Sequence, residues 1–191
     1  IKRLIVAANT NDILYRALSN GDYSTGTVTP TAAPSMDIQV SSNFERLLFD
    51  VGGRDGIALA EQMRGFEASK AMQLTNAQRD GAAALFTSMR ADEDDMARAM
   101  RWACEDCAEI VDPHTAIGLH AARAVELPHD VPVVTLATAH PAKFPDAVER
   151  STGTRPSLPA RVGDLFAREE AYTELPGTYE AVRDHILGHA A

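Results

Sequence analysis

The clearest folding signal lies in residues 3–18, which read RLIVAANTNDILYRAL. The apolar run Arg3–Ala8 is long enough for a buried strand and too short for a helix. Asn9–Asp12 then supplies side chains that favour the start of a helix, and Ile13–Leu18 is predicted as that helix. A strand, a polar turn and a helix in this order form the βα unit of a parallel sheet.

The same alternation continues along the chain. Residues 84–89 and Pro132–Ala139 are predicted as strands, and the second has the stronger strand composition because it is β-branched at its front. We expect a polar loop at residues 78–81 and a connection at residues 21–34. The predicted helices cover residues 44–49, 57–66, 96–109, 113–126, 146–150, 161–169 and 179–188. This pattern predicts an α/β fold, with a segment of parallel sheet flanked by helices and no linker within residues 1–191.

Several helix starts are marked by capping residues. Asp112 is a candidate N-cap followed by Pro113 at the first helical position, which is a strong start signal. Ser42 or Asn43 is expected to cap the helix that begins at residue 44. The acidic run Asp92–Asp95 is interpreted as a solvated helix start that complements the helix dipole.

Composition excludes several classes of function. The chain has 191 residues, 27 acidic and 18 basic, and a formal net charge of −9. No basic stripe is left to neutralise phosphates, so we expect no nucleic-acid partner. No apolar run approaches the roughly 20 residues of a membrane-spanning helix, so we expect no membrane partner. Two cysteines cannot form a disulfide framework and no leader-like segment is seen, so the expected location is the cytoplasm.

Three motifs invite a chemical interpretation that their context does not support. Cys104 and Cys107 form a C-x-x-C, but inside a predicted helix, where two partly buried cysteines are the favoured interpretation. His114 and His120 point about 120° apart on one helix, so they cannot share a metal, and no metal site is predicted. The glycine-rich stretch 52–56 follows a helix and matches no phosphate-binding motif, which favours a plain turn.

A loop-to-helix entry places Asp37, Asn43 and Arg46 close together in the sequence. A helix N-terminus with an Asn cap and an Arg in its first turn can hold an anion. Capping combined with a surface ion pair explains the same residues equally well. Spacing alone does not separate the two interpretations.

The end of the predicted strand 132–139 is the best candidate site. Ligands of open α/β sheets bind beyond the carboxyl ends of the strands. Here that position offers a hydroxyl from Thr138, an imidazole from His140 and an ammonium from Lys143 within six residues. The residues alone therefore favour a functional site at this point.

Four stretches together resemble the threonine synthase family. They are Val6–Asp12, Pro34–Arg46, Asp112–Ala116 and Leu136–Phe144, with the sequences VAANTND, PSMDIQVSSNFER, DPHTA and LATAHPAKF. They occur in the family's order and at its spacing, and the resemblance extends over essentially all 191 residues. One local departure is Ser41, where the family usually has Pro.

The resemblance implies a pyridoxal 5'-phosphate (PLP) enzyme of fold type II. The parent enzyme would convert O-phospho-L-homoserine and water into L-threonine and phosphate. By the resemblance, Thr138 occupies the position whose hydroxyl meets the pyridine nitrogen of the cofactor. His140 is expected at the rim of the same cofactor site. Lys143, Asn43 and Arg46 are expected to bind substrate, with Lys143 or Arg46 at its phosphate.

The resemblance also implies that two elements of the family are absent here. The family's Schiff-base lysine lies in an earlier segment with a Phe-Lys-Asp type motif, and its glycine-rich phosphate loop also precedes the matched region. Lys2, Lys70 and Lys143 are the lysines of this chain, and none lies in that context. The first residue is Ile1 rather than Met, as in a piece of a longer polypeptide. We therefore expect a C-terminal portion that carries no catalytic residue, is inactive alone and has the missing N-terminal portion as its partner.

Two alternatives remain open from the sequence. The chain could be a non-catalytic α/β domain that binds a metabolite or another protein. It could also belong to a sister PLP enzyme of fold type II that acts on a related phosphorylated or hydroxylated amino acid. The motifs around Pro34–Arg46 and Thr138–Phe144 favour threonine synthase over the sister enzyme.

Overall fold

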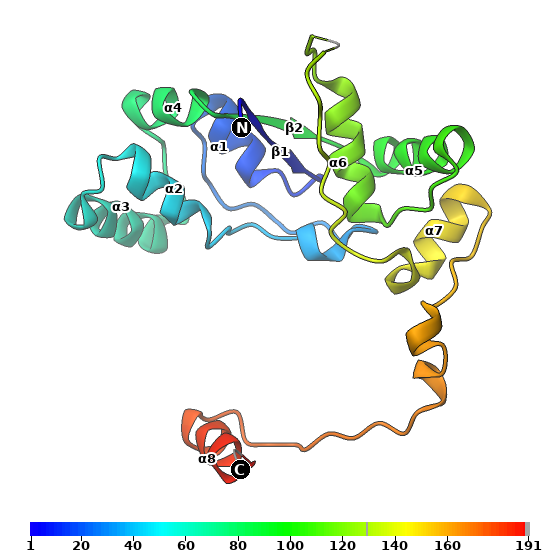
Figure 1. Cartoon of the computed structure of the whole chain (residues 1–191). Helices are drawn as coiled ribbons and strands as arrows, with labels where there is room; N and C mark the ends of the chain where they lie inside the picture. Colours follow the sequence, from blue (N-terminus) through cyan, green and yellow to red (C-terminus); the bar gives the residue numbers. More distant parts are fainter. Residues whose placement is uncertain (129, 190–191) are drawn as a thin grey trace. The chain divides into compact units, whose positions relative to one another are not determined.

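The computed structural model describes residues 1–128 and 130–189 (Figure 1). Two compact units are present, Ile1–Ser157 and Leu158–Ala191, and each is described by itself. The elements of the first unit are β1 Leu4–Ala8, α1 Ile13–Asn20, η1 Pro34–Met36, α2 Phe44–Val51, α3 Gly56–Ser69, α4 Asn76–Ala83, β2 Phe86–Arg90, α5 Glu93–Cys107, α6 Pro113–Ala124, η2 Pro141–Lys143 and α7 Pro145–Thr152. The second unit contains η3 Ala160–Val162, η4 Leu165–Ala167 and α8 Tyr179–His189.

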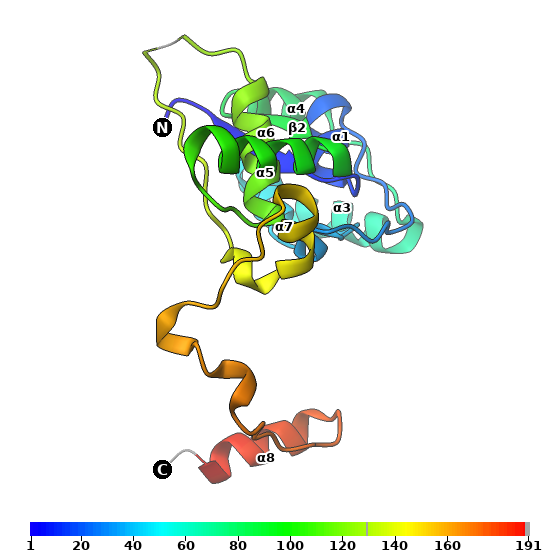
Figure 2. The ribbon, with the colours of Figure 1, turned by 90° about the vertical axis from the view of Figure 1, so that its right-hand side faces the viewer.

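A pair of parallel strands lies at the centre of the first unit. β1 pairs with β2 from Leu4 opposite Phe86 to Ala8 opposite Arg90. Helices α1 and α6 pack against this pair from opposite sides (Figures 1 and 2). The α/β fold with a parallel segment flanked by helices, predicted from the sequence, is therefore confirmed.

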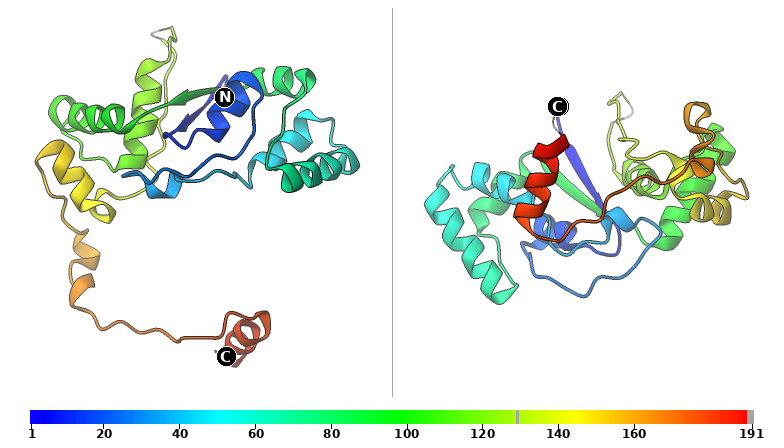
Figure 3. Two further views of the ribbon diagram at one scale, coloured as in Figure 1. Left: turned by 180° about the vertical axis from the view of Figure 1, so that it is seen from behind. Right: turned by 90° about the horizontal axis from the view of Figure 1, so that it is seen from below.

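Two groups of apolar side chains hold the helices around the strands. The first group joins α1, α2 and α3, and Tyr23 packs in it against Phe44 and Phe66 with ring centroids 4.9 and 5.0 Å apart. The second group joins α5, α6 and α7 around Met100 and Ile117. Helix α7 lies beside α5 (Figures 2 and 3). The second group supports the end of α6 at which the site described below is built.

The prediction of a loop at residues 78–81 is wrong, because α4 covers that stretch. The Thr75 hydroxyl accepts a hydrogen bond from the Gln78 backbone N–H, and the Gln78 side chain accepts one from the Thr75 N–H in return. This reciprocal capping box satisfies backbone donors that would otherwise stay free at the helix start. Polar composition suggested a loop, but the capping pair starts a helix.

The segment predicted as the strand Pro132–Ala139 does not join a sheet in the part of the chain that the structure describes. The segment instead runs along α6 (Figure 1), and a Cβ added at Gly118 of α6 would lie 2.9 Å from the Thr135 Cγ2. Val134 and Leu136 are 82% and 75% exposed. A strand is defined by a hydrogen-bonded neighbour, and no such neighbour lies beside this segment among the described residues.

The second unit has little regular structure before α8. The predicted helix 161–169 is wrong: two 3-10 turns, η3 and η4, flank Gly163 and Asp164. Glycine disfavours a helix interior and Asp favours helix ends, so the two residues divide the stretch. Helix α8 confirms the prediction for residues 179–188. Among the described residues, no helix is both long enough and apolar enough to span a membrane.

Candidate functional site at the carboxyl ends of the strands

The end of β1 leads into a network of buried amides around Asp37. Its Oδ1 accepts hydrogen bonds from Asn9 Nδ2 (2.7 Å), Asn11 Nδ2 (2.9 Å) and Thr31 Oγ1 (2.7 Å), and its Oδ2 accepts one from the Thr31 N–H (2.8 Å). Asn9 and Asn11 are buried. Asp37 therefore fixes the loop that carries Thr31 against the carboxyl end of β1.

A second set of charges ties β1, α1 and β2 together. Asp12 accepts hydrogen bonds from Arg16 Nε (2.9 Å) and Arg90 Nη1 (2.8 Å). Partial burial would raise the pKa of the Asp12 carboxyl, but the bonds from both arginines outweigh it and hold that pKa below its ordinary value. Arg16 also pairs with Asp22 at 2.5 Å. The start of α1, which follows β1, is thus linked by charge to the carboxyl end of β2.

The start of α6 is organised by Asp112, whose side chain is completely buried. Its Oδ2 accepts hydrogen bonds from the His114 N–H (2.9 Å) and from His114 Nδ1 (2.8 Å), and its Oδ1 accepts from the N–H and hydroxyl of Thr115. The predicted cap at Asp112, with Pro113 at the first helical position, is confirmed. Asp112, His114 and Thr115 are called the Asp112 cluster below.

The Asp112 cluster contacts two distant segments. His114 Nε2 accepts a hydrogen bond from the Ser35 backbone N–H at 3.2 Å, and Thr115 Oγ1 accepts one from the Thr138 backbone N–H at 3.2 Å. The His114 ring also packs on Phe144 with centroids 4.7 Å apart. Three of the motifs quoted above therefore meet at the start of α6, although they lie far apart in the sequence.

The residues of the predicted cofactor rim are exposed at this junction. Thr138 is exposed, and its backbone is held by Thr115. His140 caps η2, because its Nδ1 accepts a hydrogen bond from the Ala142 N–H at 3.1 Å. An accepting Nδ1 carries no proton, so the neutral ring has its N–H at Nε2. Lys143 is exposed, and its Nζ lies 5.8 Å from the centroid of the Phe144 ring.

Asn43 and Arg46 lie at the start of α2, and both are exposed. The expected cap is wrong, since the residue before this helix, Asn43, has helical backbone angles and makes no side-chain capping bond. Asp37 bonds to Asn9, Asn11 and Thr31 rather than to either residue. The three residues of the predicted loop-to-helix anion site are thus divided between two environments.

The motifs interpreted as structural lie on α5 and between α2 and α3. Cys104 and Cys107 are free on α5; Cys104 is partly buried as expected, but Cys107 is exposed. Residues 52–55 form the expected turn between α2 and α3, with positive φ at Gly53 and Arg54, and Gly56 begins α3. Within the described ranges, no three His, Cys, Asp or Glu side chains come together as a metal-binding group.

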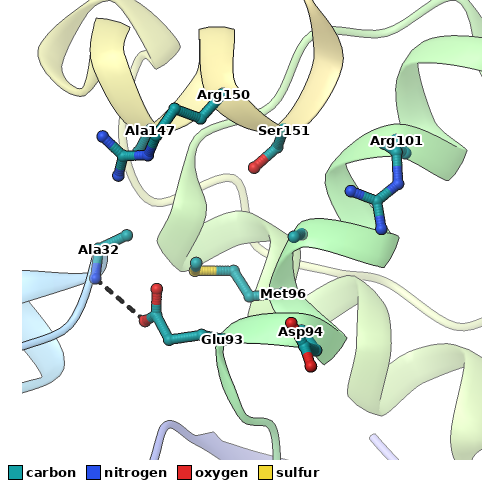
Figure 4. A pocket seen from close by; sticks show the side chains of 9 residues that line it. Ala32, Glu93, Asp94, Met96, Arg101, Ala147, Arg150 and Ser151 are labelled. Atoms are coloured by element: carbon teal, nitrogen blue, oxygen red, sulfur yellow. Dashed lines mark hydrogen bonds between the residues drawn. The ribbon is translucent and has the colours of Figure 1, made fainter.

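A cavity of about 230 Å³ opens between α5, α7 and the loop at Ala32 (Figure 4). Glu93 accepts a hydrogen bond there from the Ala32 N–H at 3.1 Å, and Arg101 and Arg150 lie on opposite sides of it. None of the predicted site residues lines this cavity. The junction at the Asp112 cluster is therefore the better candidate site.

In the sequence, Asp112 is readable as a helix cap, but nothing marks His114 or Thr115 as contacts to distant segments. The bond from Ser35 to His114 spans 79 positions of the chain, and no local pattern indicates it. The role of Thr31 as a donor to Asp37 also has no sequence signal. Only the Asp-Pro start of α6 was readable, and it predicted a cap rather than a junction.

Comparisons with known proteins show similarity to part of the threonine synthases. A family model described as "Threonine synthase, C-terminal" matches residues 115–186. The chain is 45% identical over 190 residues to the threonine synthase of Pseudomonas aeruginosa, a match that covers 99% of this chain and 40% of that protein.

Two solved structures are also similar. A crystal structure of PLP-bound threonine synthase from Brucella melitensis is 40% identical with a TM-score of 0.89, over 100% of this chain and 41% of that one. Yeast threonine synthase is 30% identical with a TM-score of 0.84, over 98% of this chain and 42% of that one. The chain thus spans about two fifths of the length of these proteins.

Proposed function

Because the chain is homologous to the C-terminal portion of threonine synthases, we propose that it forms that portion of a PLP enzyme which converts O-phospho-L-homoserine and water into L-threonine and phosphate. The observation that carries this proposal is the match of the whole chain, at a TM-score of 0.89, to a threonine synthase that binds PLP. The exposed hydroxyl and imidazole at the Asp112 junction support it independently.

Thr138 and His140 are the residues that would contact the cofactor. The Thr138 hydroxyl is exposed while its backbone is fixed by Thr115, which suits a group that must meet one ring nitrogen. A neutral hydroxyl holds a pyridine nitrogen less firmly protonated than a carboxylate does. The Nε2–H of His140 offers a donor nearby. When bound, PLP supplies an electron sink for the proton removals that precede loss of phosphate.

Lys143, Asn43 and Arg46 would bind the substrate. All three are exposed, and Lys143 and Arg46 supply positive charge for the substrate's phosphate. Lys143 lies on η2 directly after the Thr138 segment, so it would approach the same ligand from the cofactor side. Asn43 and Arg46 would act from the start of α2.

The remaining parts of the site would come from the rest of a longer polypeptide. Lys2, Lys70 and Lys143 are exposed, and Lys70 closes α3 in a left-handed conformation. None matches the family's Schiff-base context, so the chain alone would be inactive. The apolar segment at Val134 and Leu136 would be covered by that N-terminal portion, in which its strand partner would lie. With both cysteines free, we place the protein in the cytosol.

The test is phosphate release from O-phospho-L-homoserine by the open reading frame that contains this chain, loaded with PLP. We expect release by the longer polypeptide and none by residues 1–191 alone. Thr138→Val should lower kcat, because a methyl group cannot hydrogen-bond to a ring nitrogen, and Thr138→Ser should retain most activity. Wild-type turnover by Thr138→Val would remove Thr138 from the site, and no release by the longer polypeptide would overturn the function.

Assays with other substrates distinguish threonine synthase from a related PLP enzyme of fold type II. O-phospho-L-serine carries its phosphate on a shorter side chain than O-phospho-L-homoserine does. L-threonine carries a hydroxyl and no phosphate. If either is turned over with a higher kcat/KM than O-phospho-L-homoserine, the protein is a related PLP lyase instead. Turnover of none of the three, together with no binding of PLP, would favour a non-catalytic domain.

A further inference from the structure

Two exposed hydroxyl residues are held by their backbones to neighbouring side chains of one buried cluster. Ser35 and Thr138 are both exposed, and they lie 103 positions apart in the chain. The Ser35 N–H donates to His114 Nε2, and the Thr138 N–H donates to Thr115 Oγ1, each at 3.2 Å. His114 and Thr115 both bond in turn to Asp112.

From this arrangement we propose that Asp112 is a positioning residue, which sets Ser35 and Thr138 in one geometry through His114 and Thr115. The proposal rests on the proposed function, in which Thr138 meets the cofactor, and it adds Ser35 as a second exposed residue held at the same cluster. Asp112 itself is fully buried, so it acts through these two neighbours.

The hydrogen bonds that join Ser35 through His114 to Asp112 are called the His114 arm, and each has a defined donor and acceptor. A backbone N–H can only donate, so His114 Nε2 carries no proton and Nδ1 carries the one that it donates to Asp112 Oδ2 at 2.8 Å. The ring is 8% exposed and packs on Phe144, which leaves it little freedom to turn. Ser35 is therefore tied to the carboxylate through a ring in one fixed tautomer and orientation.

The hydrogen bonds that join Thr138 through Thr115 to Asp112 are called the Thr115 arm, and each of them also has a defined donor and acceptor. Thr115 Oγ1 accepts from the Thr138 N–H and has one proton, which it donates to Asp112 Oδ1. A hydroxyl with both roles occupied cannot rotate without breaking one of them. The backbone of Thr138 is thus fixed at the point where the chain turns toward η2.

Capping alone does not account for these contacts. An N-cap carboxylate needs only backbone donors from the first turn of its helix, as Asp55 shows with the N–H groups of Ile57 and Ala58. Asp112 has two such donors and accepts two side-chain donors as well. Each of those side chains contacts a segment outside α6, so the cluster links segments as well as starting a helix.

The experiment uses the longer polypeptide that contains this chain and measures amide hydrogen exchange at Ser35 and Thr138. Thr115→Val keeps the shape and removes the hydroxyl, so Thr138 should exchange about tenfold faster while Ser35 is unchanged. His114→Phe keeps the ring and removes both nitrogens, so Ser35 should exchange faster while Thr138 is unchanged. Asp112→Asn should accelerate both amides, because it weakens both arms.

A kinetic measurement separates positioning from general loosening. Thr115→Val should lower kcat with little change in KM for O-phospho-L-homoserine and should shift the absorbance of bound PLP, and Thr115→Ser should restore both. If Thr115→Val accelerates Ser35 and Thr138 equally, or neither, the two-arm arrangement is wrong. If the amides respond as expected but the wild type releases no phosphate, the proposed function fails and the structural link stands.

Discussion

The polar side chains of the first unit fall into two regions with opposite environments. Around Asp37 and Asp112 they are mostly buried and bonded on every side, and no buried side-chain nitrogen or oxygen in the described ranges lacks a partner. From Thr138 to Lys143 they are exposed or half-buried and make few contacts. The first region, around Asp37 and Asp112, has the contacts of a structural frame, and the second has exposed side chains with few contacts, as its proposed ligand-binding role requires. Both regions lie in the stretches that resemble the threonine synthase family, so these stretches contain buried, bonded residues as well as exposed ones.

This difference predicts that the buried region contributes stability and the exposed region contributes function. Urea unfolding of variants in each region measures this division as a change in the free energy of unfolding.

Asp112→Ala should have the largest effect, a loss of about 3 kcal/mol. The change removes a helix cap and leaves the donors of His114 and Thr115 without their buried acceptor. Asp55→Ala is the matched control, because Asp55 caps α3 at an exposed site, and it should cost about 1 kcal/mol. Equal losses in the two variants would show that the Asp112 cluster is no more than a cap.

Asp37→Ala should cost about 2 kcal/mol, because four donors from Asn9, Asn11 and Thr31 lose their acceptor. Asp37 is only partly buried, so water can replace some of these bonds and the loss should be smaller than at Asp112. Asp37→Asn keeps one acceptor oxygen and should cost less than Asp37→Ala. A loss below about 0.5 kcal/mol in Asp37→Ala would place the loop at Thr31 outside the frame.

Asp12→Asn tests the charges between the strands, with an expected loss of about 1 kcal/mol at pH 7. The folded pKa of Asp12 lies below its ordinary value of 3.8, so its stabilisation is present above that value. The stabilisation is lost as the pH falls through the lower folded pKa. The difference between wild type and variant should therefore disappear in acid. A difference that stays constant with pH would contradict the charge pairing with Arg16 and Arg90.

The sequence predicted the elements whose signals are local. The strand at β1, the parallel pairing and the start of α6 at Asp112 all follow from apolar periodicity and capping residues. The loop expected at residues 78–81 failed because polar composition hides the capping box of Thr75 and Gln78. That box is also local, because its two side chains lie three positions apart, which is the spacing that marks a helix start.

The remaining features depend on contacts that the sequence does not display. The segment 132–139 has the composition of a strand, but pairing needs a neighbour, and none lies beside it in the described chain. For the site, Thr138, His140 and Lys143 were readable as a polar cluster after an apolar run. The bonds of Ser35 and Thr138 to α6 were not readable, since they join residues 79 and 23 positions apart.

The smallest effect on stability should come from Thr138→Val and Lys143→Ala, each within about 0.5 kcal/mol of the wild type. Both side chains are exposed, and the contact that holds Thr138 uses its backbone N–H, which the valine variant keeps. Their effect should appear instead in catalysis by the longer polypeptide, as a lower kcat for Thr138→Val and a higher KM for Lys143→Ala. An exposed side chain that serves a ligand makes no contact that stabilises the fold. A loss of stability as large as that of Asp37→Ala would therefore show that Thr138 and Lys143 contribute to the structural frame.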